Sequence, residues 1–222
     1  MGEWIPLTTP EGPVRAWTAR PDGPPRGAVV VIQEIFGVNH HIREVTDRFA
    51  EAGFTAMAPA LFDLVRPETE FKYDEAGVLH GRDYVDQVGM QRALKVVGAA
   101  ARWLRESGHH VAAVGFCWGG TVAMLANTRL RLTSVTYYGG RSVPYLGEPA
   151  LAPMLFHFGE DDPIIPPEDV EKHRVFHPEA VIHTYPAGHG FNCDERDDYN
   201  AECAKLAWER TIAFLAEHLH EH

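Results

Sequence analysis

The chain has 222 residues, a length that fits one α/β domain with a full core better than two small domains. Apolar residues make up 45% and charged residues 23%, which is typical of a soluble globular protein and argues against a disordered chain or a membrane protein. The net charge of −11 repels a phosphate backbone. We therefore expect neither nucleic acid nor a membrane as a partner.

The cysteines and the N-terminus give a prediction of location. Cys117, Cys193 and Cys203 are too few, and odd in number, for a disulfide framework. The first residues show no basic segment followed by an apolar one, and no apolar run approaches the length that spans a bilayer. These features predict a cytoplasmic protein in a reducing compartment.

Strands and helices are expected to alternate in the first half of the chain. The run Ala28–Gln33 is continuously apolar up to its last residue, which is typical of a strand covered on both faces of a parallel sheet. Apolar residues then recur at spacings of three and four, up to a glycine that ends the helix. The elements expected here are strands over 28–33, 54–62 and 109–116, with helices over 42–52 and 90–104.

The second half continues the same pattern, with strands expected over 132–140, 153–162 and 180–186, and helices over 121–127, 167–176 and 204–219. This alternation favours right-handed crossovers and a doubly wound, mostly parallel sheet with helices on both faces. No linker divides the chain, so we expect a single domain over 1–222. The least regular stretch, 62–86, is charged and aromatic, as lids and substrate loops often are.

The segment Gly115-Phe116-Cys117-Trp118-Gly119-Gly120 lies between an expected strand and an expected helix. Its spacing is that of a nucleophile elbow, in which glycines make room for a strained turn that carries the nucleophile. The start of the helix would also favour a thiolate and a developing oxyanion. The alternative is a structural cysteine in a glycine-rich turn.

A nucleophile on this fold is followed along the chain by an acid and then by a histidine. Glu160, Asp161 and Asp162 come after one expected strand, and His189, between two glycines, comes after the next. In such sheets the site lies beyond the carboxyl ends of the strands. Each residue alone could be structural, but the three types in this order favour a catalytic triad.

These motifs, together with Gln33-Glu34-Ile35-Phe36-Gly37, resemble the dienelactone hydrolase (carboxymethylenebutenolidase) family of α/β-hydrolases. The resemblance runs in the same order from about residue 12 to the terminal helix. It implies that Cys117 is the nucleophile and that Asp162 and His189 are its partners. The choice of Asp162 over the two acids before it rests on this resemblance alone.

The resemblance also implies that the backbone N–H groups of Ile35 and Trp118 form the oxyanion hole, and that Glu34 lies beside the thiol. A carboxylate there could keep the thiol protonated while the site is empty, which would protect it from oxidation. The alternative for Glu34 is a loop glutamate paired with an arginine.

The chain departs from the family after the histidine. Founding members have a serine next and an arginine soon after, and both help to bind the substrate carboxylate; Gly190 and Cys193 stand at those places here. Arg82 and Arg196 are the candidates to replace them, although either could be a surface arginine in an ion pair.

The C-terminal histidines are a possible metal site. His218 and His222 are four residues apart, a spacing that can bind a metal on one helix face, with His220 between them. The sequence places no further ligand nearby, so we expect a solvated tail and no metal site.

The sequence therefore predicts a hydrolase without cofactor or metal that cleaves an activated ester or an enol lactone through an acyl-enzyme. Its partner would be a small-molecule substrate, and the protein would be a monomer or a small homo-oligomer. The alternatives are a general short-chain carboxylesterase and a binding protein that has kept the scaffold without turnover. A thiol redox protein is disfavoured because no C-x-x-C motif is present.

Overall fold

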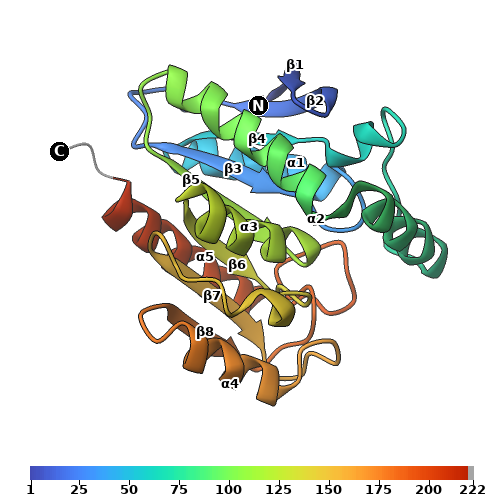
Figure 1. Cartoon of the computed structure of the whole chain (residues 1–222), viewed down its shortest axis with the longest axis vertical. Coiled ribbons are helices and arrows are strands. Elements are labelled where there is room, and N and C mark those ends of the chain that lie inside the picture. The colour runs from blue at the N-terminus through green and yellow to red at the C-terminus, as the bar shows by residue number, and fades with distance from the viewer. Residues whose placement is uncertain (220–222) are drawn as a thin grey trace. The chain divides into compact units, whose positions relative to one another are not determined.

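The computed structural model describes residues 1–219 (Figure 1). The chain divides into two compact units, unit 1 with Met1–Ala112 and Leu219, and unit 2 with Ala113–His218. The expectation of a single domain over 1–222 stays a prediction. His220 and His222 lie outside the described residues.

Unit 1 begins with a hairpin that the sequence reasoning missed. Its elements are β1 (Glu3–Thr9), β2 (Gly12–Ala19), β3 (Ala28–Ile32), α1 (His40–Glu51), β4 (Thr55–Pro59), the 3₁₀ helix η1 (Leu61–Leu64), α2 (Glu75–Glu106) and the start of β5 (Val111–Phe116). The strand order is β1-β2-β4-β3. β1 and β2 pair antiparallel, as do β2 and β4, whereas β3 and β4 are parallel. β1 and β2 alternate between buried and exposed residues, so they lack the continuous apolar run by which the other strands were recognised.

The helix expected over 42–52 is confirmed as α1. The side chain of Asn39 caps it by accepting a hydrogen bond from the N–H of Ile42 at 3.2 Å. Ile42, Val45 and Phe49 are the buried stripe that the spacing predicted. Gly53 follows the helix with φ +93°, a conformation that favours glycine.

The expectation of an irregular stretch over 62–86 is wrong in its second half, because α2 begins at Glu75. Asp74 caps this helix by accepting from the N–H of Gly77 at 2.7 Å. The backbone at Gly89 is not helical, with φ 69° and ψ 159°, so the helix is kinked there. The kink breaks the apolar periodicity, which explains why the sequence predicted a helix only after it.

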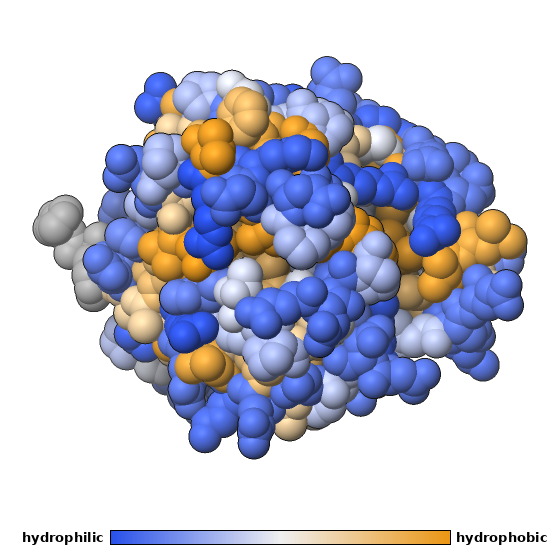
Figure 2. Space-filling view, turned by 90° about the horizontal axis from the view of Figure 1, so that it is seen from below, coloured by the Kyte–Doolittle hydropathy of each residue, from blue (hydrophilic) through white to orange (hydrophobic). Residues whose placement is uncertain are grey.

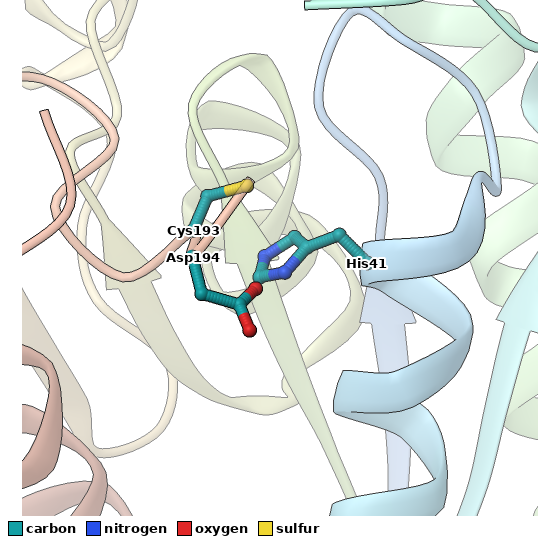
Figure 3. Close-up of side chains that lie close together, drawn as sticks. All are labelled: His41, Cys193 and Asp194. Carbon is teal, nitrogen blue, oxygen red and sulfur yellow. The ribbon is translucent and has the colours of Figure 1, made fainter. Parts of the chain in front are cut away.

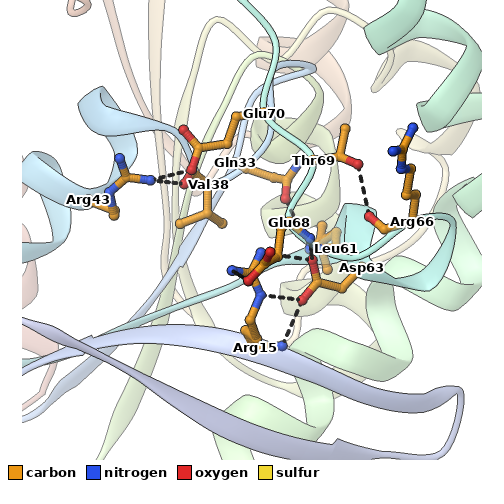
Figure 4. Close-up of polar contacts among 10 residues, drawn as sticks. All are labelled: Arg15, Gln33, Val38, Arg43, Leu61, Asp63, Arg66, Glu68, Thr69 and Glu70. Atoms are coloured by element: carbon orange, nitrogen blue, oxygen red, sulfur yellow. Dashed lines mark hydrogen bonds and ion pairs between the residues drawn. The ribbon is translucent and has the colours of Figure 1, made fainter.

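The segment between β4 and α2 is fixed by charged side chains of unit 1 (Figure 4). The Arg15 guanidinium donates to both carboxylate oxygens of Asp63, at 3.0 and 3.2 Å, and its backbone N–H donates at 3.0 Å. Asp63 also accepts from the backbone of Glu68. Farther along, Arg43 of α1 donates to Glu70 at 2.5 Å. The paired Arg15–carboxylate bonds give the segment a defined path across β2.

Unit 2 completes the alternation of strands and helices. Its elements are the end of β5, α3 (Trp118–Leu130), β6 (Thr133–Tyr137), the 3₁₀ helix η2 (Val143–Tyr145), β7 (Met154–Gly159), α4 (Pro167–Phe176), β8 (Val181–Tyr185) and α5 (Ala201–His218). The order is β5-β6-β7-β8, and β7 is parallel to both β6 and β8. In Figure 1, α3 lies in front of β6 and α5 behind it. Every residue of β6 and β7 is buried, as expected for a sheet covered on both faces.

These elements confirm the predicted α/β class. The terminal helix ends at His218, one residue before its expected end.

Among residues 1–219, no helix is long and apolar enough to cross a membrane. On the face seen in Figure 2, hydrophilic residues predominate and apolar side chains gather in separate small groups, which is ordinary for a folded protein.

Candidate active site

Cys117 sits at the sharp turn between β5 and α3. Its φ is 55° and its ψ is −119°, a conformation that side-chain-bearing residues rarely adopt. The backbone N–H of Cys117 donates to the carbonyl oxygen of Tyr137 at 2.9 Å. A Cβ on Gly115 would lie 1.8 Å from the carbonyl oxygen of Gly119, and one on Gly120 would lie 3.0 Å from that of Tyr137. The glycines are therefore required by the turn itself.

The turn presents the cysteine at the start of a helix. Cys117 is partly exposed, whereas Cys193 and Cys203 are buried. Trp118 is the first residue of α3, so its N–H lies at the positive end of the helix dipole. This position favours a thiolate on the sulfur and negative charge on an oxygen beside it.

His189 and Asp162 meet Cys117 in unit 2. The Nε2 atom of His189 lies 3.1 Å from the Cys117 sulfur, and its Nδ1 lies 2.7 Å from Oδ2 of Asp162. The side chain of Asp162 is 0% exposed and that of His189 is 5% exposed. The other carboxylate oxygen of Asp162 accepts from the N–H of Ile164 at 2.8 Å. A carboxylate only accepts hydrogen bonds, so Nδ1 carries a hydrogen and Nε2 faces the sulfur.

Geometry distinguishes among the three acids that the sequence left open. Glu160 is exposed and accepts from the Thr184 hydroxyl at 2.9 Å, and Asp161 is exposed as well. Of the three, Asp162 is the buried one and the one hydrogen-bonded to the histidine. Gly159 allows this approach, because a Cβ there would lie 2.3 Å from the carbonyl oxygen of Ala187.

The electrostatics of His189 are set by its two partners. Burial lowers its pKa, but the negative charge on the Cys117 sulfur and the hydrogen bond to Asp162 outweigh burial and raise the pKa to about 10. His189 is therefore an imidazolium at neutral pH whenever the sulfur is a thiolate. The three side chains can hold an ion pair with a third group that orients it.

Tyr138, which the sequence reasoning missed, packs against the imidazole and in turn against Phe191. The ring of Tyr138 lies 5.1 Å from that of His189 and 5.4 Å from that of Phe191. Tyr138 has φ 41°, unusual for a bulky residue, and its N–H donates to the carbonyl of His157 at 2.8 Å. The signal in the sequence was a pair of tyrosines before two glycines at a strand end.

In unit 1, Glu34 is fully buried in the loop after β3, unlike a surface glutamate. The Tyr73 hydroxyl donates to Oε2 of Glu34 at 2.9 Å, and the amide of Asn39 donates to the Tyr73 oxygen at 2.9 Å. Because an amide nitrogen only donates, the tyrosine hydrogen is directed to the carboxylate. Ile35, the next residue, is partly exposed.

The two candidate substrate-binding arginines have different surroundings. Arg82 is exposed on α2 in unit 1. Arg196 of unit 2 is half-buried, and its guanidinium lies over Gly190, where an added Cβ would be 2.7 Å from the Cζ atom. Gly190 also has φ +86°. The glycine that replaces the family serine thus makes room for Arg196 beside the histidine loop.

Three further side chains, two in the loop after β8 and one in α1, are of types that can bind a metal. Cys193 is buried and Asp194 exposed in the loop after β8, and His41 is a buried residue of α1 (Figure 3). The expectation that the protein uses no metal or cofactor stays a prediction.

Comparison with known proteins gives a consistent result. The model of the dienelactone hydrolase family matches residues 14–219. A Synechocystis protein named “putative carboxymethylenebutenolidase” is 34% identical over 205 residues, 82% of each chain. Carboxymethylenebutenolidase 1 of Cupriavidus pinatubonensis is 30% identical over 212 residues, 90% of each chain.

Solved structures agree with this match. A Klebsiella pneumoniae protein whose crystal structure is described as a “putative dienelactone hydrolase” is 30% identical, with a TM-score of 0.88 over 98% of both chains. An esterase of Pyrobaculum calidifontis shares the fold, with a TM-score of 0.68 at 18% identity over 98% of this chain and 85% of its own. The family model and its relatives cover most of the chain, and the protein therefore belongs to the dienelactone hydrolase family of α/β-hydrolases, as an ester or lactone hydrolase.

Proposed function

We propose that the protein cleaves activated carboxylic esters or enol lactones through a Cys117–His189–Asp162 triad and an acyl-enzyme. The observation that carries this proposal is the line of hydrogen bonds from the sulfur through the imidazole to a buried carboxylate, beneath a strained turn. A structural cysteine needs no such partners.

The steps follow from the roles of these groups. When substrate binds, His189 takes the proton of Cys117, and the thiolate attacks the carbonyl carbon while the N–H groups of Ile35 and Trp118 stabilise the oxyanion. When the C–O bond breaks, the leaving oxygen takes the proton of His189, which Asp162 keeps in orientation. Water then attacks the thioester while His189 accepts its proton. The C–S bond breaks, the departing sulfur takes that proton back, and the acid is released.

A sulfur nucleophile restricts the substrate. In the tetrahedral intermediate, the thiolate and the substrate oxygen compete as leaving groups, and a thiolate leaves easily. The reaction goes forward when the substrate oxygen leaves as readily, as an enolate or an aryloxide does. Activated esters and enol lactones therefore suit Cys117 better than peptides or alkyl esters, which disfavours the alternative of a general carboxylesterase.

The substrate's charge is the second part of the proposal. Arg196 lies against Gly190, next to the catalytic histidine, where a cation could hold a carboxylate of the substrate. Arg82 is the other candidate, exposed on α2. We expect a small-molecule substrate, a cytoplasmic location and a monomer or small homo-oligomer, without nucleic acid or membrane as a partner.

A substrate panel tests both parts. Enol lactones and aryl esters, each with and without a carboxylate, are assayed with the wild type, Cys117→Ala and Arg196→Met. We expect Cys117→Ala to lose turnover of every member, and Arg196→Met to lose the preference for the anionic ones. Cys203→Ala, which alters a buried thiol in α5, is the matched control. Turnover by Cys117→Ala would refute the mechanism, and wild-type binding without turnover would favour a binding protein.

The pH profile tests the role of Asp162. Removing its negative charge in Asp162→Asn should lower the pKa of His189 from about 10 by roughly one to three units. Because the imidazolium formed in the substrate complex protonates the leaving group, the alkaline limb of kcat should then move to lower pH. Asp161→Asn, in an exposed neighbour, should keep the wild-type profile. An unchanged alkaline limb in Asp162→Asn would contradict the assignment.

Thiol reactivity tests the role proposed for Glu34. If its charge keeps the resting thiol protonated, Glu34→Gln should be alkylated by iodoacetamide and oxidised by peroxide faster than the wild type at neutral pH. Tyr73→Phe keeps the ring contact with Phe36 but removes the hydrogen bond to the carboxylate. Because the charge of Glu34 remains, this variant should not show the faster reaction of Glu34→Gln. Equal rates in Glu34→Gln and the wild type would leave the gate without support.

A further inference from the structure

A chain of buried polar side chains joins β6, β7, β8 and α5 in unit 2. The Tyr137 hydroxyl lies 2.7 Å from the Thr211 hydroxyl, which lies 3.0 Å from Nε2 of His157. Nδ1 of His157 lies 2.8 Å from the Tyr185 hydroxyl, to which Nη1 of Arg210 donates at 3.1 Å. All members except Arg210 are at most 2% exposed. We name this set of five residues the buried relay.

Arginine only donates hydrogen bonds, so the contact of Arg210 with Tyr185 favours one direction in the buried relay. Arg210 occupies the Tyr185 oxygen, and burial raises the pKa of Tyr185, so its hydrogen is available for Nδ1 of His157. Burial, with His183 and Arg210 adding to it, lowers the pKa of His157 well below its ordinary value. His157 is therefore neutral. If the Tyr185 hydrogen is directed to Nδ1, the hydrogen of His157 is on Nε2, which would donate to Thr211, and Thr211 would donate to Tyr137.

The buried relay ties together β6, β7 and β8. The loops after β7 and β8 carry Asp162 and His189, and β6 accepts a hydrogen bond from the turn of Cys117. Tyr137 is the last residue of β6 and lies opposite His157 of β7, while Tyr185 is the last residue of β8. The Tyr137 carbonyl holds the N–H of Cys117 at 2.9 Å. Gly159 is the last residue of β7 and pairs with Tyr185 of β8. The loop that carries Asp162 follows directly after Gly159.

Ring contacts extend this set toward the turn and the histidine loop. Phe116, directly before the nucleophile, stacks on Tyr137 with ring centroids 4.7 Å apart. Phe191, two residues after His189, lies 5.1 Å from the ring of Tyr185. A change in the buried relay therefore reaches the neighbours of both Cys117 and His189 through packed rings.

We propose that the buried relay positions the triad, with Thr211 and His157 as positioning residues and Arg210 as the group that fixes the tautomer of His157. This inference rests on the proposed function, because it concerns the alignment of the same three catalytic residues. The hydrogen bonds of the triad join Cys117, His189 and Asp162 to one another, so the relay residues are not part of the triad itself. Their effect is on alignment, for which small displacements cost large factors in rate.

Kinetics of Thr211 variants test the proposal. Thr211→Val keeps the shape but loses the hydroxyl that joins Tyr137 to His157, so kcat should fall about tenfold while KM changes less than about twofold. Thr211→Ser, which keeps the hydroxyl, should restore kcat. Thr46→Val is the matched control, since it deletes a buried hydroxyl in α1 that donates to the Ile42 carbonyl at 2.7 Å. Wild-type kcat in Thr211→Val would overturn the proposal.

A second variant keeps the test valid if Thr211→Val does not fold. Arg210 is half-buried, so Arg210→Met should fold, but it removes the donor that sets the direction. Nitrogen NMR of the histidine rings should show His157 in the Nε2–H form in the wild type and in mixed tautomers in Arg210→Met, with a lower kcat. An unchanged tautomer, or an unchanged kcat, in that variant would overturn the proposal.

Cys117→Ala in the same assay distinguishes failure of the relay proposal from failure of the proposed triad. If it is inactive and Thr211→Val has wild-type kcat, only the buried relay fails. If Cys117→Ala is active, the triad fails, and the relay proposal with it.

Discussion

The backbone turn at Cys117 is the constraint on which the site depends. Its positive φ costs of order 1–3 kcal/mol, and it exists because neighbouring glycines allow backbone atoms to approach where a Cβ would overlap them. The hydrogen bond from Cys117 to Tyr137 holds the turn against β6. The sulfur thus stands at the start of α3, within 3.1 Å of His189.

Burial gives these contacts their strength. A carboxylate and an imidazole that are almost fully buried are costly unless each is paired. Asp162 has both oxygens hydrogen-bonded, and His189 has a partner on each nitrogen, so the negative sulfur and the carboxylate can raise the pKa of the imidazole despite burial. The same rule applies to the buried relay, in which we propose that Arg210 sets the direction of the hydrogen bonds.

The sequence predicted those parts of the fold and site that leave a local signal. Continuous apolar runs identified the central strands, and flanking glycines identified Cys117 and His189. The hairpin β1–β2 was missed because its residues alternate in burial, and the start of α2 because Gly89 interrupts the helix. Asp162 differs from Asp161 only by which way its side chain faces in the folded loop. Contacts such as Tyr73 with Glu34 join residues far apart in the chain, so no spacing reveals them.

The acyl group of the substrate should pass through Cys117, and the mass of the protein during turnover shows directly whether it does. An activated aryl ester is mixed with the enzyme, the reaction is quenched in acid within the first turnovers, and the intact protein and its peptides are weighed. We expect a mass increase equal to one acyl group, located on the peptide that carries Cys117 and released by hydroxylamine as a thioester would be. Product release without any acylated protein, or with the acyl group on another residue, would contradict it.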